Sequence, residues 1–180
     1  VFINDILSQA KCDVKNLNGV IIGKGPGSYT GLRIGTACAK GLCYSLDIPL
    51  ISINSLEIMS ERISPVSNQL LIPMLDARRM EVYTMILDHN KNIIKNTWAE
   101  ELTENSFTQY LKDKTCVFFG NGSEKFKSID PKGKTVFLEE EYFPSAKDMI
   151  LKGHELFMSK KFESTAYYEP FYLKEFISSN

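Results

Sequence analysis

A glycine-rich turn constrains this sequence more than any other feature, because it joins an apolar run to a long segment that carries little charge. The turn and the start of that segment read Lys24-Gly25-Pro26-Gly27-Ser28-Tyr29-Thr30-Gly31-Leu32-Arg33-Ile34-Gly35. The apolar run before it, Val20-Ile21-Ile22, predicts a buried strand, and the segment after it, which continues to Leu46, predicts a helix. A strand, a glycine turn and a buried helix form half of a βαβ unit.

The turn does not match the common phosphate-binding or nucleophile motifs. No Ser or Thr follows Lys24, which excludes a Walker A loop, and the glycine spacing fits neither the dinucleotide-binding pattern nor the nucleophile elbow. One remaining interpretation is a tight structural turn with a side-chain cap on the helix, and this is the one that we favour. The other is a phosphate site at the helix N-terminus. Its candidate residues are Gly25, Gly27, Ser28 and Thr30.

The predicted helix after the turn is apolar on nearly all sides. Between Leu32 and Leu46 only Arg33 and Lys40 are charged, and their spacing of seven places both on one narrow stripe. Such a helix is buried on more than one side. One side would face the sheet. The other would be covered by a helix predicted over residues 1–11 or by a helix of a second protein, and both alternatives stay open.

The pattern of apolar runs divides the chain of 180 residues into two parts. Residues 1–63 alternate helix and strand, which is typical of a parallel sheet with covering helices. The polar linker at 64–68 is the expected boundary of a second part that spans 68–180. There the pattern predicts strands at 69–75, 81–87, 93–99, 115–119 and 135–138, a helix at 103–111, and a helix that begins at a capping box of Ser145 and Asp148. We expect the last helix or the aromatic tail to pack back on the core.

Composition excludes several classes of protein. A formal net charge of -1 argues against a chain that holds nucleic acid by itself. The four cysteines form no C-x-x-C pair and predict reduced thiols in a cytoplasmic protein. No apolar run reaches the ~18 residues that a membrane helix needs. The sequence opens without Met and in the middle of a helical pattern, so we expect the natural N-terminus to lie further upstream.

Candidate catalytic residues are few. The charged residues at 76–81 are more typical of a hairpin turn than of a catalytic cluster. Gly120-Asn121-Gly122 fits either a nucleotide contact or a plain left-handed turn. His89 and His154 lie far apart and belong to no ligand-spaced pair, which argues against a metal site. We therefore expect no catalytic apparatus, metal or cofactor in this chain.

The glycine motif from Gly25 to Gly35 resembles the signature of the TsaB (YeaZ) family, the bacterial dimerisation subunit of the machinery that makes threonylcarbamoyladenosine in tRNA. Shorter matches follow in the family's order and extend over nearly the whole chain. They are Asp76-Ala77-Arg78 with Glu81-Val82-Tyr83, Pro144-Ser145-Ala146, and Pro170 with Tyr172-Leu173. The first motif is long and specific, whereas the others are weak when taken alone.

The resemblance implies an α/β fold of the actin, Hsp70 and sugar-kinase type, which is ribonuclease H-like and has two subdomains. Family members begin with a β-meander that has no counterpart here, so we expect the first sheet to lack its N-terminal strands. The implied function is a noncatalytic scaffold that pairs with a TsaD-type transferase, and with itself when alone. A TsaE-type ATPase would join the complex, ATP and metal would bind to the partner subunits, and tRNA would bind only through the complex.

The family pairs through helices, which here implies an interface on residues 1–11 and on the helix after the glycine motif. The expected interface residues are Ile3, Ile6, Leu7, Gly31, Leu32, Gly35, Cys38, Ala39 and Leu42. Two other functions stay open. The first is a kinase or ATPase of the same superfold, with phosphates at Gly25–Gly31 and Gly120–Gly122. The second is a peptidase, once suggested for the family, although the sequence offers no nucleophile–base pair.

Overall fold

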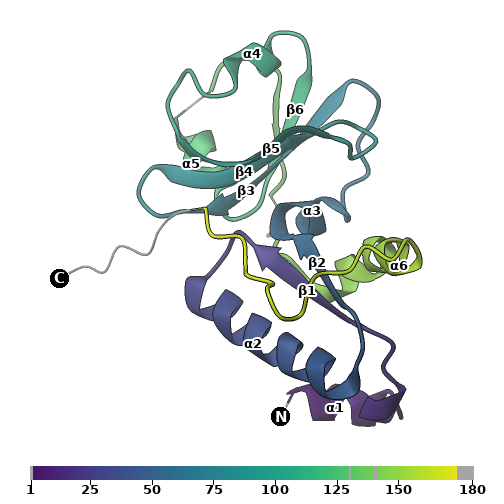
Figure 1. Cartoon of the computed structure of the whole chain (residues 1–180). Coiled ribbons are helices and arrows are strands. Elements are labelled where there is room, and N and C mark those ends of the chain that lie inside the picture. Colours follow the sequence, from purple (N-terminus) through teal and green to yellow (C-terminus); the bar gives the residue numbers. More distant parts are fainter. Residues whose placement is uncertain (1, 130, 140–141, 174–180) are drawn as a thin grey trace, which may run out of the picture.

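The computed structural model describes residues 2–129, 131–139 and 142–173. Figure 1 shows two sheets with helices around them. The elements in chain order are α1 (Phe2–Gln9), the 3-10 helix η1 (Val14–Asn16), β1 (Val20–Gly25), α2 (Tyr29–Leu46), β2 (Leu50–Asn54), α3 (Ser55–Ser60), β3 (Gln69–Asp76), β4 (Glu81–Leu87), β5 (Ile93–Glu101), α4 (Thr108–Leu111), β6 (Thr115–Phe119), α5 (Ser123–Ser128), β7 (Thr135–Phe137), the 3-10 helix η2 (Ala146–Met149) and α6 (Ile150–Met158).

The smaller sheet contains β1 and β2, which pair in parallel with Val20 opposite Leu50. Helix α2 connects the two strands, because parallel neighbours need a crossover rather than a hairpin. This confirms the alternation of helix and strand that the sequence predicts for the first third. Helix α3 follows β2 directly. Asn54 caps it, because its side-chain Oδ1 accepts a hydrogen bond from the backbone N–H of Leu56 at 2.8 Å.

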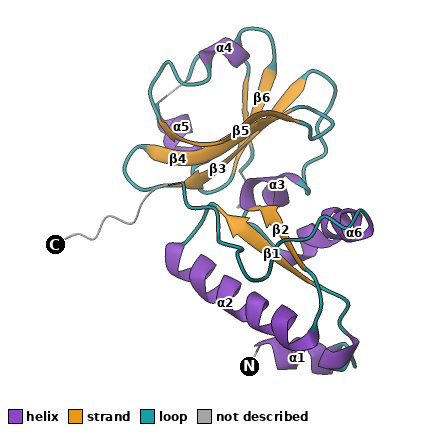
Figure 2. Cartoon of the chain, viewed as in Figure 1, coloured by secondary structure: helices purple, strands orange, loops and turns teal. Residues whose placement is uncertain are grey.

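The larger sheet has five strands in the order β5-β4-β3-β6-β7 (Figure 2). The three strands β3, β4 and β5 form an antiparallel meander, whereas β6 and β7 run parallel to β3. The predicted hairpin over 69–87 and the third strand after it are confirmed. Strand β3 is the central strand of this mixed sheet, and its six residues from Leu70 to Leu75 are all buried.

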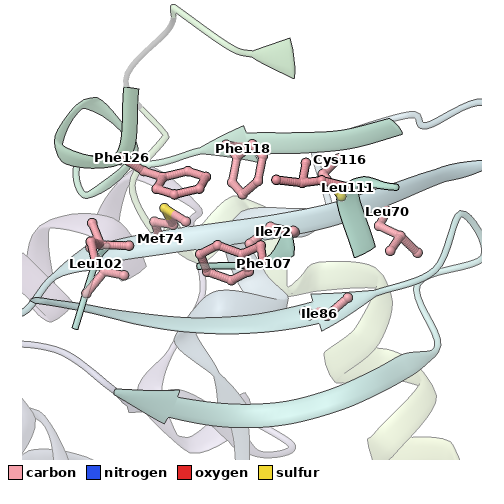
Figure 3. Packing of buried hydrophobic residues seen from close by; sticks show 11 residues of the cluster. Leu70, Ile72, Met74, Ile86, Leu102, Phe107, Leu111, Cys116, Phe118 and Phe126 are labelled. Atoms are coloured by element: carbon pink, nitrogen blue, oxygen red, sulfur yellow. The ribbon is translucent and has the colours of Figure 1, made fainter. Parts of the chain in front are cut away.

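The main core lies on one face of the larger sheet. Figure 3 shows Phe107, Phe118 and Phe126 packed together there, with ring centroids 4.9–5.6 Å apart. The opposite face packs against α3 through Leu56 and Met59, which are fully buried. Because α3 contacts β1, β2 and β3, it joins the two sheets. Burial of so much aromatic and aliphatic surface supplies the main stabilisation of this half.

The end of the chain returns to the smaller sheet. Helix α6 packs on it so closely that a Cβ at Gly153 would lie 2.3 Å from Cδ1 of Ile21. Beyond α6, the backbone N–H of Glu163 donates to the carbonyl of Leu50 at 2.8 Å. Tyr168 lies buried in the core beneath α2. The boundary at 64–68 stays a prediction, and the contacts of α6 and the tail connect residues beyond it to the first part.

Two predicted helix starts are wrong. Only Thr108–Leu111 is helical in the predicted 103–111 helix, because Phe107 adopts a φ of 63° where its ring enters the core. Ser145 makes no side-chain cap, so the predicted capping box is absent. The chain after Ser145 begins instead with the 3-10 helix η2, in which the backbone N–H of Asp148 donates to the carbonyl of Ser145. Within the described residues, no helix is both long and apolar enough to cross a membrane.

Candidate partner-binding surface

The glycine turn places α2 at a fixed angle to β1. Ser28 is the N-cap, and its Oγ accepts a hydrogen bond from the N–H of Gly31 at 3.3 Å. Gly25 has a φ of 104°, and a Cβ there would lie 2.9 Å from the carbonyl oxygen of Phe171. Glycine is therefore required at this position both for the backbone angle and for the close approach of the tail. The predicted structural turn with its Ser28 cap is confirmed.

One side of α2 packs on the smaller sheet. Its buried residues are Thr36, Ala39 and Cys43, and they recur at the spacing of one helix face. Burial raises the pKa of the Cys43 thiol, and a hydrogen bond with the backbone of Val20 offsets part of that rise. This face fixes the helix on the fold, so it offers no surface to a partner.

The rest of α2 is open to solvent and carries little charge. Gly31, Gly35 and Cys38 are exposed, and Leu32 and Leu42 are half-buried beside them. A Cβ at Gly35 would meet no atom within 4 Å. Other residues of this helix are also exposed, among them Ile34, which is 66% exposed, and Tyr44, which is 86% exposed. A broad apolar helix face of this kind is unusual on a surface that meets only water.

One expected interface residue is on the wrong side of the helix. Ala39 is 3% exposed and packs with Cys43, Leu50 and Tyr168 beneath α2. The expectation that Ala39 lies at a partner interface is therefore corrected. The error arose because the small residues of α2 occupy both faces, and the sequence alone does not say which face meets the sheet.

Helix α1 does not cover the open face of α2. The structure excludes the alternative that residues 1–11 bury that face entirely, since Gly35 and Cys38 remain exposed. Helix α1 has no buried residue. Its apolar side chains face solvent: Ile3 is 40% exposed and Ile6 is 66% exposed, while Leu7 is half-buried. Both helices lie at the end of the molecule away from the larger sheet (Figure 1).

The tail of the chain fastens α2 to the smaller sheet. The Nζ atom of Lys40 donates to the carbonyls of Ala166 and Tyr168, each at 3.1 Å. The N–H of Phe171 donates to the carbonyl of Lys24 at 2.8 Å. Reasoning from the sequence missed this role of Lys40, and a lone lysine on an apolar helix was the only signal that could have indicated it.

The candidate phosphate-binding residues are only partly available. Gly27, Ser28 and Thr30 are exposed, whereas Gly25 is buried beneath the tail. The Ser28 hydroxyl already accepts the cap hydrogen bond, although it could still donate one. Phosphate binding at this turn stays a prediction.

The second predicted phosphate loop makes its hydrogen bonds within the chain. Asn121 Oδ1 accepts from the N–H of Asp76 at 2.9 Å, and the N–H of Gly122 donates to the carbonyl of Met74 at 3.1 Å. Gly120 has a φ of 96°, which confirms the left-handed turn. The charged hairpin is confirmed as well: Lys125 lies 2.8 Å from the Asp76 carboxylate, which helps to keep the pKa of Asp76 below its usual value despite partial burial.

Three other titratable side chains lie on separate elements, Glu57 on α3, His89 in the turn after β4 and His154 on α6. Between α3 and α6, burial raises the pKa of Glu57, and the charges of Lys24 and Lys152 lower it in part. His89 and His154 are exposed, one in a turn and one on α6. Among the residues that the structure describes, no group of three or more His, Cys, Asp or Glu side chains could hold a metal ion.

Known proteins are similar to this chain over most of its length. Residues 1–167 match the family model described as TsaD, tRNA N6-adenosine threonylcarbamoyltransferase. The chain is 40% identical over 159 residues to the tRNA threonylcarbamoyladenosine biosynthesis protein TsaB of Buchnera aphidicola subspecies Acyrthosiphon pisum, covering 82% of this chain and 68% of that one. The protein of the same description from Bacillus subtilis is 31% identical over 137 residues, which cover 71% of this chain and 56% of the Bacillus protein.

Two solved structures from Pseudomonas aeruginosa share the fold. One, an uncharacterized protein with similarity to peptidase YEAZ, has a TM-score of 0.78 at 18% identity and covers 96% of this chain and 81% of that one. The other, YeaZ, has a TM-score of 0.75 at 19% identity and covers 95% and 81%. The mixed five-stranded sheet and this likeness confirm the α/β, ribonuclease H-like fold class.

The chain spans 56% of the length of the Bacillus relative and 68% of the Buchnera relative. The sequence identity to the Buchnera relative extends over most of the chain, and the fold agrees with that of the Pseudomonas YeaZ structure. On this evidence the chain belongs to the TsaB (YeaZ) family.

Proposed function

We propose that this chain is a noncatalytic scaffold subunit in the synthesis of threonylcarbamoyladenosine in tRNA, and that α2 is its docking helix for a TsaD-type transferase. The relatives' names support the pathway. The observation that carries the scaffold role is the open face of α2, where Gly31, Gly35 and Cys38 let another backbone approach closely. Burial of this face in a complex would remove exposed apolar surface from water, which favours association.

The proposal assigns the chemistry to other subunits. A TsaE-type ATPase would join the complex, ATP and metal would bind to the partners, and tRNA would reach this chain only through the complex. The same face of α2 would pair with a second copy when the partner is absent, because a self-complementary helix face serves both purposes. The location would be the cytoplasm, where tRNA is modified.

The test is partner capture by the Gly35→Arg variant. A Cβ at Gly35 meets nothing within 4 Å, so the arginine adds bulk and charge to the surface without disturbing the fold. We expect capture of a TsaD-type protein by the tagged chain to fall at least roughly tenfold, the equivalent of about 1.4 kcal/mol. Ser128→Arg on α5 is the matched control, since it adds the same charge at an exposed site near the larger sheet. Equal capture by both variants would refute the proposal.

The kinase or ATPase alternative has less support. Ser28 and Asn121 already make hydrogen bonds within the chain at the two expected phosphate loops. Calorimetry with Mg-ATP that shows micromolar binding, abolished by Gly27→Asp at the exposed turn, would favour it over the scaffold. The peptidase similarity belongs to the description of the Pseudomonas protein, and a casein assay would test it here.

A further inference from the structure

A cavity of about 250 Å³ lies beside β5 in the larger sheet, away from the open face of α2. Its residues come from β5 and from the segment that leads into α4. They are Lys95, Trp98, Glu100, Asn105, Ser106, Phe107, Thr108, Gln109 and Tyr110. The cavity is slightly smaller than the roughly 300–1,000 Å³ of a pocket for a drug-sized ligand, so it suits a compact ligand of mononucleotide size rather than an extended cofactor.

One wall of this cavity is held rigid by Glu100. Its Oε2 accepts a hydrogen bond from Trp98 Nε1 at 2.7 Å, and its Oε1 accepts one from Ser106 Oγ at 2.9 Å. Both carboxylate oxygens are therefore engaged, and the indole is fixed in orientation. A fixed wall lowers the entropy that a ligand would lose on binding.

The floor of the cavity is anchored in the core. Phe107 is 6% exposed, and its ring packs edge-on against Phe118 and Phe126. To place the ring there, the backbone of Phe107 adopts a left-handed φ of 63°, which a bulky residue rarely does. Left-handed conformations at such residues persist where the surrounding structure holds them, and they gather at binding sites.

Lys95, Asn105 and Gln109 are further polar residues that line the cavity. No described residue hydrogen-bonds to the side chains of Lys95, Asn105 or Gln109. The Lys95 ammonium lies over the Trp98 ring, 3.5 Å from its centroid. The cavity thus offers an indole ring beneath a lysine, a cation that has no carboxylate partner among the described residues, and two amides that those residues do not hydrogen-bond.

These groups match the parts of a nucleotide. Bases stack on aromatic side chains, cations pair with phosphate, and Asn or Gln amides form paired hydrogen bonds with the edge of adenine in particular. We propose that the cavity binds one adenine nucleotide, with the base against Trp98, the base edge at Asn105 or Gln109, and the phosphate at Lys95. The ammonium would leave the indole face as the base arrives. Free AMP or an unpaired adenosine of an RNA strand would supply the same chemistry.

This site is independent of the proposed docking helix. The cavity lies beside β5 and α4 at one end of the molecule, whereas α2 lies at the other (Figure 1). A partner on α2 would leave the cavity open. The two proposals can therefore fail separately: Gly35→Arg would leave nucleotide binding unchanged, and Lys95→Ala would leave partner capture unchanged.

The test uses Trp98 as its own reporter, since it is the single tryptophan of the chain. The full chain is titrated with AMP, with ribose 5-phosphate, and with short single-stranded oligoadenylate and oligouridylate RNA. We expect saturable quenching of Trp98 fluorescence by AMP or oligoadenylate and none by ribose 5-phosphate. Tighter binding of oligoadenylate than of AMP would identify RNA as the source, and binding of AMP alone would identify the free nucleotide.

Variants test the assignment of groups. Calorimetry should show Kd raised roughly 5- to 150-fold by Trp98→Ala, the range for loss of one stacked base. Lys95→Ala should raise Kd about tenfold, whereas Lys112→Ala, at an exposed lysine outside the cavity, should leave it unchanged. Absence of binding by AMP and oligoadenylate up to millimolar concentration, or a Kd that Lys95→Ala does not change, would overturn the proposal.

Discussion

Ala37 and Ala39 lie two residues apart on α2 and face opposite ways. Two residues turn a helix by about 200°, so the side chains lie on nearly opposite faces. Ala39 is 3% exposed above Leu50, whereas Ala37 is exposed. The same substitution, alanine to glutamate, therefore tests which side of α2 holds the fold and which side is free for a partner.

We expect Ala39→Glu to destabilise the fold severely. The longer side chain overfills the contact between α2 and the smaller sheet, which costs about 1–3 kcal/mol. Its carboxylate would lie among apolar groups and would have to stay unpaired or take up a proton, which adds several kcal/mol more. The free energy of unfolding should fall by about 4 kcal/mol or more, a large share of the roughly 5–15 kcal/mol of a typical domain. Ala37→Glu should change it by less than about 0.5 kcal/mol.

Urea unfolding followed by far-ultraviolet circular dichroism measures both variants against the unchanged chain. The midpoint should shift strongly for Ala39→Glu and hardly at all for Ala37→Glu. Equal midpoints for the two variants would contradict the packing of α2 on the smaller sheet through Ala39. Destabilisation by Ala37→Glu alone would show that the helix is rotated from its position here.

Three further predictions concern other parts of the chain. Gly120→Ala should lower the free energy of unfolding, measured by urea titration, by about 3 kcal/mol. The reason is that φ at this residue is 96° and the new Cβ would lie 2.3 Å from the carbonyl oxygen of Met74. A loss below about 1 kcal/mol would contradict this geometry. In the chain diluted until it is monomeric, iodoacetamide at pH 8 should modify exposed Cys38 well before Cys116, whose pKa burial raises to about 11, as peptide mass spectrometry would show. Burial raises the pKa of Tyr168 to about 12, above its ordinary value near 10, so the folded state holds this proton more tightly than the unfolded state does. The free energy of unfolding should therefore fall as the pH rises from 10 to 12. Tyr168→Phe should remove that fall and, because no described group bonds the buried hydroxyl, should raise stability by about 1 kcal/mol at pH 7; an unchanged pH profile would refute this.

The sequence by itself determined the order of elements in the first third and the hairpin of the larger sheet. These features depend on local signals, such as the apolar run before Gly25 and the cap at Ser28, which act within a few residues. The family followed from one long motif. Local signals failed where a distant contact overrode them: the predicted helix begins only after Phe107, because the core holds the ring of that residue.

Tertiary structure alone decided which face of α2 is free. Ala39 and Gly35 look alike in sequence, as small residues on one apolar helix, yet β2 and the tail bury the first and leave the second open. The contact of Lys40 with the tail spans more than 120 residues of chain, and no local pattern encodes it. The cavity beside Trp98 likewise depends on how β5 and the segment before α4 come together. Such contacts form only when the chain folds, because burial and hydrogen bonding between distant segments depend on the whole packing arrangement.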